Sequence, residues 1–215
     1  MKKSIPALCI GFFLCFFVSA YMDATEAALA DGVIRLHVIA NSDSEQDQAL
    51  KLKVRDRILK ECGPLLSDGK KIDTIRSDVV SNLDYIKQIA MEELSLYGCD
   101  YSVDVSFGMA DFPRKDYGSI TLPAGEYQAL RVMIGNASGK NWWCVLFPPL
   151  CFVDETCVGA EADSNLMLKS NLGNSTYDMV TSDGACVELR MKTYELWQQG
   201  KNMLGAYLAT IGETY

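Results

Sequence analysis

Residues 141–154, N-W-W-C-V-L-F-P-P-L-C-F-V-D, are the most shape-restricted stretch of this 215-residue chain. Trp142 and Trp143 are consecutive, so in an extended segment their side chains leave on opposite faces. Either both faces are covered, or one tryptophan is displayed. Pro148 and Pro149 each fix a φ angle and remove a backbone donor, which excludes a helix interior through them. The stretch therefore predicts an extended segment that runs into a rigid corner.

The N-terminus predicts export. Lys2 and Lys3 form a short positive region, residues 4–20 are almost uninterruptedly apolar, and Val18-Ser19-Ala20 is a small-residue cleavage site. We expect residues 1–27 to be a signal peptide or, if uncleaved, an N-terminal membrane anchor, and residues 28–215 to be a single exported domain. The membrane would be contacted only through the uncleaved segment.

Composition limits the class of partner. Half of the residues are apolar and 22% are charged, which is typical of a globular domain. The net charge is −8, and loss of Lys2 and Lys3 would make it −10, from 18 basic and 28 acidic residues. This balance argues against nucleic acid and against electrostatic docking on anionic lipid.

Six cysteines lie beyond the N-terminal segment, at positions 62, 99, 144, 151, 157 and 186. An even number in an exported domain permits disulfides, but the order alone does not give the pairing. Cys144 and Cys151 are the disulfide candidate, because a bridge would close a loop of eight residues, worth about 2–3 kcal/mol. Zinc is a weaker alternative, since there is no C-x2-C pair and the single histidine is distant. No metal or cofactor is expected.

Hydrophobic patterning predicts the first half of the fold. Residues 33–40 alternate as a strand, with Ile34, Leu36 and Val38 on one face and Arg35, His37 and Ile39 on the other. The polar residues 41–44 then offer N-caps for a helix that ends at Gly63-Pro64. A second helix is expected over residues 74–97, with a buried stripe that runs from Val79 to Tyr97 and a stop at Gly98.

Strands dominate the next part of the chain. Residues 101–107 alternate as a half-buried strand, and residues 119–122 and 127–134 predict a hairpin joined across Pro123-Ala124-Gly125. Beyond residue 154 the signal weakens, to a short helix at 162–171, a strand at 187–191 and a final helix at 194–208. The fold class is therefore α+β, a single domain with a mainly antiparallel sheet packed by two or three helices.

Catalytic motifs are poorly represented. The chain has no G-x-S-x-G, H-E-x-x-H or phosphate-binding glycine loop, so a catalytic triad would have to use His37. The simpler interpretation is that His37 is a histidine covered by a helix. The alternative is that it belongs to a polar site that binds a carboxylate or orients a partner. Asp43, Glu45 and Asp47 alternate like calcium ligands, but an acidic first helical turn explains them better.

Three motifs carry a resemblance to a known family. They are residues 34–43 (I-R-L-H-V-I-A-N-S-D), residues 122–134 (L-P-A-G-E-Y-Q-A-L-R-V-M-I) and the stretch at 141–154. Together they closely resemble stage II sporulation protein R, a family of secreted signalling proteins of endospore-forming bacteria. The resemblance is densest over residues 33–60 and 112–154 and thins beyond Cys157.

The resemblance implies a ligand with no catalytic residues, made in the forespore and secreted into the space between the two membranes. There it would activate a membrane-embedded sporulation aspartic protease that processes pro-sigma-E. The residues we expect to bind this partner are Arg35, His37, Asn41, Asp43, Glu126, Trp142, Trp143, Phe147 and Asp154. Docking predicts that Trp142 or Trp143 is exposed beside residues 35–43. An exported cell-envelope hydrolase using Arg35, His37 and Asp43 is the alternative, and a structural envelope protein is a third.

Overall fold

The computed structural model describes residues 27–66, 70–151 and 158–181, together with residues 13, 17, 20, 24, 200 and 203. Its elements are β1 (Ile34–Ile39), α2 (Glu45–Cys62), the 3-10 helix η1 (Gly63–Leu66), α3 (Ile72–Ser81), α4 (Leu83–Leu96), β2 (Val103–Phe112), β3 (Lys115–Tyr117), β4 (Ile120–Leu122), β5 (Gly125–Ile134), β6 (Asn141–Phe147), α5 (Val158–Leu172) and α6 (Asn174–Thr181). The predicted elements at 187–191 and 194–208, and most of the predicted signal segment, lie outside this description. In the described part, no helix has the length and apolar character needed to cross a membrane.

Among the described strands, four form one sheet in the order β2-β5-β1-β6. β1 runs parallel to β5 and antiparallel to β6, and β2 runs antiparallel to β5. The register places His37 between Arg131 on β5 and Trp143 on β6. The predicted α+β class with a mainly antiparallel sheet is confirmed.

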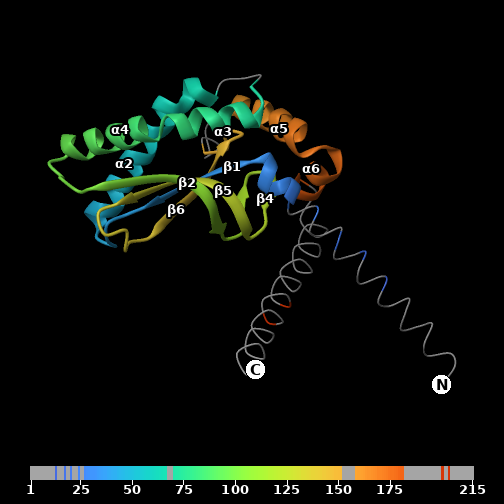
Figure 1. Ribbon diagram of the computed structural model, residues 1–215, viewed down its shortest axis with the longest axis horizontal. Coiled ribbons are helices and arrows are strands. Elements are labelled where there is room, and N and C mark those ends of the chain that lie inside the picture. The colour runs from blue at the N-terminus through green and yellow to red at the C-terminus, as the bar shows by residue number, and fades with distance from the viewer. Residues whose placement is uncertain are drawn as a thin grey trace, which may run out of the picture.

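One face of the sheet is covered by helices. Figure 1 shows α3 and α4 lying over the sheet, with α5 and α6 at one end of the molecule. Ile34, Leu36 and Val38 of β1 pack in one core cluster with Leu50, Val54 and Ile58 of α2, as their spacing predicted. Burying each such aliphatic side chain contributes about 1.5–3 kcal/mol, so this layer supplies most of the cohesion. We call the opposite side of the sheet the second face.

α2 begins and ends where the sequence places its caps. The Ser44 hydroxyl accepts a hydrogen bond from the Asp47 backbone N–H, and Gly63 follows the last turn. Glu45 and Asp47 lie in the first turn, where the helix dipole favours acidic residues. The interpretation as a helix N-terminus is therefore confirmed, and no cluster of candidate metal ligands is found among the described residues.

The helix predicted over residues 74–97 is two helices. α3 ends and α4 begins at Asn82, whose backbone is non-helical with φ −112° and ψ 14°. The Asn82 side-chain amide donates to the Asp78 carbonyl at 2.7 Å, so it takes the acceptor of a regular helical turn. Tyr97 follows α4 and is half exposed, not part of the buried stripe. Gly98 has a positive φ of 69°, in keeping with the predicted stop.

The predicted hairpin between residues 119–122 and 127–134 is wrong. β4 pairs with β3, whereas β5 pairs with β2 and β1. β2 is longer than the predicted 101–107 strand and offers β5 ten partners, from Val103 opposite Ile134 to Phe112 opposite Gly125. The small β3–β4 ribbon is thus an insertion between the long strands β2 and β5. The closeness of β4 and β5 in sequence therefore did not predict their pairing.

The second face is partly covered by its own cluster. α5 is longer than the predicted helix at 162–171, and it meets a further helix, α6, at Gly173, which has a φ of +73°. Leu168 and Leu172 of α5 pack in a cluster with Leu122 of β4 and Val145 of β6. This cover lies at one end, and the rest of the second face holds the candidate site.

Candidate functional site

The candidate site is a row of side chains across the second face. Strand alternation places His37 of β1 between Arg131 of β5 and Trp143 of β6, and Ser106 of β2 is opposite Arg131. Ser106, Arg131 and Trp143 are half-buried, whereas His37 is only 6% exposed. The row therefore presents polar and aromatic groups on a rigid sheet.

His37 and Trp143 form a stacked pair. Their ring centroids are 3.6 Å apart at an interplanar angle of 23°, and Phe112 contacts both rings by its edge, at 5.9 and 4.7 Å. The Nε2 of His37 lies 2.8 Å from the Asn141 side-chain oxygen. An amide oxygen only accepts, so Nε2 carries the proton of the neutral ring and donates it. His37 is thus covered by a tryptophan, and not by a helix as the sequence suggested.

The environment favours neutral His37. Burial lowers its pKa, the hydrogen bond to Asn141 raises it by less, and the charge of Arg131 lowers it further. Protonation of His37 would place a second positive charge beside Arg131 in a partly desolvated site.

This shift predicts a loss of stability in mild acid. The folded pKa lies below the ordinary value of about 6.5, so the unfolded chain binds the proton more readily. The stability contributed by neutral His37 is fully present above about pH 6.5. As the pH drops from there towards the folded pKa, the free energy of unfolding falls by at most about 1.4 kcal/mol per pH unit. Urea unfolding between about pH 7 and 5 measures it. His37 is the only histidine, so His37→Gln should remove this slope; equal slopes in both proteins would contradict the assignment.

Arg35 is enclosed beside this pair. It is fully buried, and its Cζ lies 4.3 Å from the ring centroid of Phe112, 5.0 Å from Tyr127 and 5.8 Å from Tyr117. Its Nε donates to the Cys144 carbonyl at 3.2 Å, and Nη2 donates to the Tyr117 hydroxyl at 3.1 Å. Burial lowers the pKa of Arg35, and the two tyrosines oppose this. An arginine remains charged even so.

Asn41 and Asp43 hold the turn that leads into β6. The Asn41 side-chain oxygen accepts from the Asn136 backbone N–H at 3.0 Å, and its amide donates to Asp47 at 2.9 Å. The Asp43 carboxylate accepts from the Lys140 backbone N–H at 2.6 Å. Both residues therefore fix the position of Trp142 and Trp143, and their own polar atoms are already engaged.

The two tryptophans lie on opposite faces, as predicted. Trp142 packs against the helix-side core, where the Arg55 guanidinium lies 4.2 Å from its ring centroid. Trp143 packs against the cluster of the second face. Both are half-buried and lie beside β1, opposite Val38 and His37 respectively. Neither ring is fully exposed to solvent, but the solvent-exposed part of Trp143 belongs to the candidate row.

Three other predicted residues do not join this row. Phe147 is buried in the helix-side core, and Glu126 is exposed near the start of β5, opposite Asp111. Asp154 lies outside the described residues. The proposed hydrolase set is not assembled either: aromatic rings enclose Arg35, and the Asp43 carboxylate binds the Lys140 backbone and not His37.

Sequence reasoning missed six members of the site: Ser106, Phe112, Tyr117, Tyr127, Arg131 and Asn141. Asn141 opens the Trp-Trp stretch, so its position was a signal for a polar group beside the strand. The others come from elements whose pairing was wrongly assigned or whose length was underestimated. Their grouping depends on the register of β2, β5 and the β3–β4 ribbon.

A disulfide joins Cys144 and Cys151, as predicted, with Cα atoms 5.3 Å apart. It ties the middle of β6 to the segment after Pro149. Next to it is a cavity of about 160 Å³, lined by residues 115–118 and 142–144 and by Leu150 and Cys151. The cavity therefore lies between β6 and the β3–β4 ribbon, directly beside Trp143.

Removing this disulfide should lower the free energy of unfolding by about 2–3 kcal/mol, because an eight-residue loop is no longer closed in the unfolded chain. Urea unfolding of a Cys144→Ser/Cys151→Ser chain measures the loss. A reductant should bring the wild-type chain to the same midpoint and leave the double variant unchanged. Cys62 is a matched control: it is free and buried, with a pKa raised to about 11, so Cys62→Ala should keep the response to reductant. An unchanged midpoint in the double variant would contradict the prediction.

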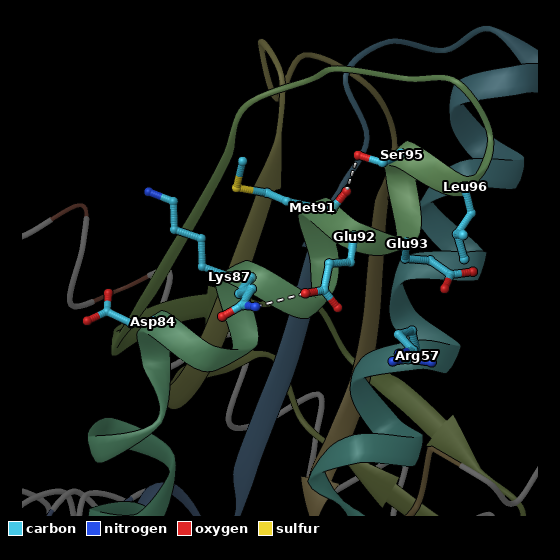
Figure 2. Close-up of a pocket in the computed structure, with 9 residues that line it drawn as sticks. Arg57, Asp84, Lys87, Met91, Glu92, Glu93, Ser95 and Leu96 are labelled. Atoms are coloured by element: carbon cyan, nitrogen blue, oxygen red, sulfur yellow. Dashed lines mark hydrogen bonds between the residues drawn. The ribbon is translucent and has the colours of Figure 1, made fainter.

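A larger groove of about 710 Å³ lies on the helical side, between α4 and Arg57 of α2 (Figure 2). Its side chains form local contacts on the helix surface. Gln88 donates to Glu92 at 2.8 Å, and Ser95 donates to the Met91 carbonyl at 3.0 Å. Both are i to i+4 pairs, which are ordinary on an exposed helix. The groove is larger than the cavity beside Trp143 and includes the buried Nε of Arg57, which is unpaired within the described residues, but the same guanidinium already pairs with Glu61 one turn along α2 at 3.3 Å, so we do not regard the groove as the functional site.

Comparison with known proteins gives the family. The sequence model described as stage II sporulation protein R matches residues 30–157. The chain belongs to the stage II sporulation protein R family. The stage II sporulation protein R of Bacillus subtilis (strain 168) is 42% identical over 164 residues, which are 72% of this chain and 73% of that protein. No solved structure matches this chain.

The region shared with the stage II sporulation protein R family contains the whole candidate site. It runs from before β1 to beyond β6 and so includes the aromatic rings around Arg35, the His37–Trp143 pair and the disulfide. α5 and α6 follow it. The resemblance seen in the three sequence motifs is thereby confirmed.

Proposed function

We propose that this chain is an exported sporulation signal, made in the forespore, that activates a membrane-embedded aspartic protease in the mother-cell membrane. The protease then processes the pro-sigma-E factor. Membership of the stage II sporulation protein R family supports a role in sporulation. The apolar segment at residues 4–20 supports export. In this proposal the chain is a ligand and performs no chemistry itself.

The observation that carries the proposal is the half-buried Trp143 ring, held in place by its neighbours. His37 stacks on it, Phe112 contacts it by an edge, and the disulfide restrains the adjacent residue Cys144. Little side-chain or backbone entropy is left to lose when such a ring docks, so more of the contact free energy remains for binding. A ligand activates its target only if it binds the active state, or an active dimer, more tightly than the inactive one.

Co-expression tests the proposal. The full chain, the candidate protease and its pro-sigma substrate are produced in a non-sporulating host, and substrate cleavage is followed on immunoblots. We expect cleavage with the full chain and none with the protease alone. A chain without residues 1–27 is the control for export and should not elicit cleavage, provided that it accumulates to the same level. Cleavage by the unexported chain, or none with the full chain, would contradict the proposal.

A further inference from the structure

The buried cation of Arg35 has no anionic partner among the described residues. Its hydrogen bonds go to a carbonyl and a phenol, and Nη1 finds no partner in the described part of the chain. The groups that oppose the burial effect on its pKa are Tyr117 and Tyr127, and no carboxylate is among them. Aromatic faces compensate a buried cation only in part, and an unpaired buried charge is costly. Within the described residues, the site therefore lacks one negative group.

The cavity beside the disulfide adjoins this cation. Both hydrogen-bond partners of Arg35, the Tyr117 hydroxyl and Cys144, belong to residues that line it. The Tyr117 oxygen accepts from Arg35, and within the described part its own proton has no acceptor. Burial is the main cause that raises the pKa of Tyr117, Arg35 opposes it, and the net shift is upwards, so the hydroxyl keeps its proton. A phenol polarised by a cation is a strong donor to an anion.

The mouth of the cavity has an excess of positive charge. Lys115 lines it and forms no ion pair in the described part of the chain. Asp116 also lines the cavity, but its negative charge is balanced by Arg114 at 3.8 Å, and its carboxylate accepts from the Thr121 hydroxyl at 2.7 Å, so Lys115 is the positive charge left over at the mouth. Among the described residues, Lys115 and Arg35 therefore stand uncompensated, in a chain whose net charge is −8. Such a local reversal of sign attracts a negatively charged group.

We propose that this cavity receives one acidic side chain of the partner protein. Its carboxylate accepts the Tyr117 hydroxyl proton and pairs with Lys115 at the mouth, and Tyr117 couples it to the Arg35 cation. A volume of about 160 Å³ suits one side chain and is below the roughly 300–1,000 Å³ of small-molecule sites. This inference rests on the proposed function only for the identity of the partner, which is the protease. Trp143 lines the same cavity, so a segment that delivers the carboxylate also contacts its ring.

Peptide binding tests the inference directly. The full-length chain is titrated with N-acetyl-Ala-Glu-Ala-amide, and NMR follows the Arg35 Nε–H and the indole N–H of Trp143. We expect saturable shifts of both signals, and none with the matched Gln peptide. Tyr117→Phe removes only the hydroxyl and should weaken binding about tenfold, the low end for a hydrogen bond to a charged group. Lys115→Gln should weaken it about threefold. Lys87→Gln removes a positive charge on α4 and should change nothing.

Several outcomes would overturn the inference. Equal binding of the Glu and Gln peptides would show that the carboxylate is not recognised. Equal shifts with acetate or inorganic phosphate would make the cavity a general anion site. The absence of any shift, or full binding by Tyr117→Phe, would refute the assignment of the donor.

The cleavage assay separates this inference from the proposed function. If the Glu peptide binds as expected but the full chain elicits no cleavage, the cavity stands and the proposed function fails. If the full chain elicits cleavage and Tyr117→Phe does so equally well, the cavity does not receive the protease.

Discussion

Trp143→Ala is expected to reduce pro-sigma cleavage at least tenfold, whereas Trp142→Ala should reduce it less than about twofold once folded protein is equal. The two tryptophans are adjacent in sequence but lie on opposite faces of β6. Both tryptophans line the cavity, but only Trp143 stacks on His37 at the second face, whereas Trp142 packs into the helix-side core with Arg55 over its ring. Each substitution should lower the free energy of unfolding by about 2–3 kcal/mol, because both rings are half-buried.

The near-equal stability loss makes Trp142→Ala a matched control for folding. Urea unfolding and the level of exported protein are measured for both variants, and cleavage is compared at a temperature where both are folded. A functional loss caused by instability would then affect the two variants alike. Equal cleavage by the two variants, or a greater loss with Trp142→Ala, would place the docking surface elsewhere.

Features that depend on local sequence were predictable. The alternation in residues 33–40 gave the two faces of β1, and Ser44 and Gly63 gave the limits of α2. The opposite directions of Trp142 and Trp143 follow from strand geometry alone. In each case a short-range rule decides the outcome, so distant contacts could not overturn it.

Features that depend on strand pairing were not predictable. β3 and β4 pair with each other because β5 pairs with β2 and not with β4. That pairing depends on the ten-residue length of β2, which the sequence pattern did not show. The aromatic rings around Arg35 follow from it, since Phe112 ends β2 and Tyr117 ends β3. The sequence identified Arg35 and His37 as candidates but did not identify what surrounds them. Charge compensation, the basis of the cavity proposal, depends on those surroundings.

The roles of Asn41 and Asp43 show the same limit. Family resemblance placed them among the residues that bind a partner, and the structure shows their polar groups holding the turn at residues 135–140. Such a role is also needed for function, because the turn fixes where β6 begins. A residue can therefore belong to a family motif by positioning the contact surface.

Gly139→Ala is expected to lower the free energy of unfolding by about 3 kcal/mol, the largest loss that we predict for adding one methyl group. A Cβ at Gly139 would overlap the backbone carbonyl of Ser42 and crowd the Ala40 side chain. Backbone atoms cannot relieve the overlap by a change of rotamer, as a flexible side chain can. The Gly139 N–H also donates to the Ala40 carbonyl at 3.0 Å, so the turn cannot retreat without losing this hydrogen bond.

Gly63→Ala is the matched control, because a Cβ at that position meets no atom within 4 Å and the backbone there is already helical. It should be neutral or slightly stabilising. Urea unfolding of the two variants measures the difference. Displacement of the turn would also move the start of β6, so the Trp143 indole signal should shift in Gly139→Ala and not in Gly63→Ala. A Gly139→Ala chain as stable as wild type, with an unmoved indole signal, would mean that the turn does not position Trp143.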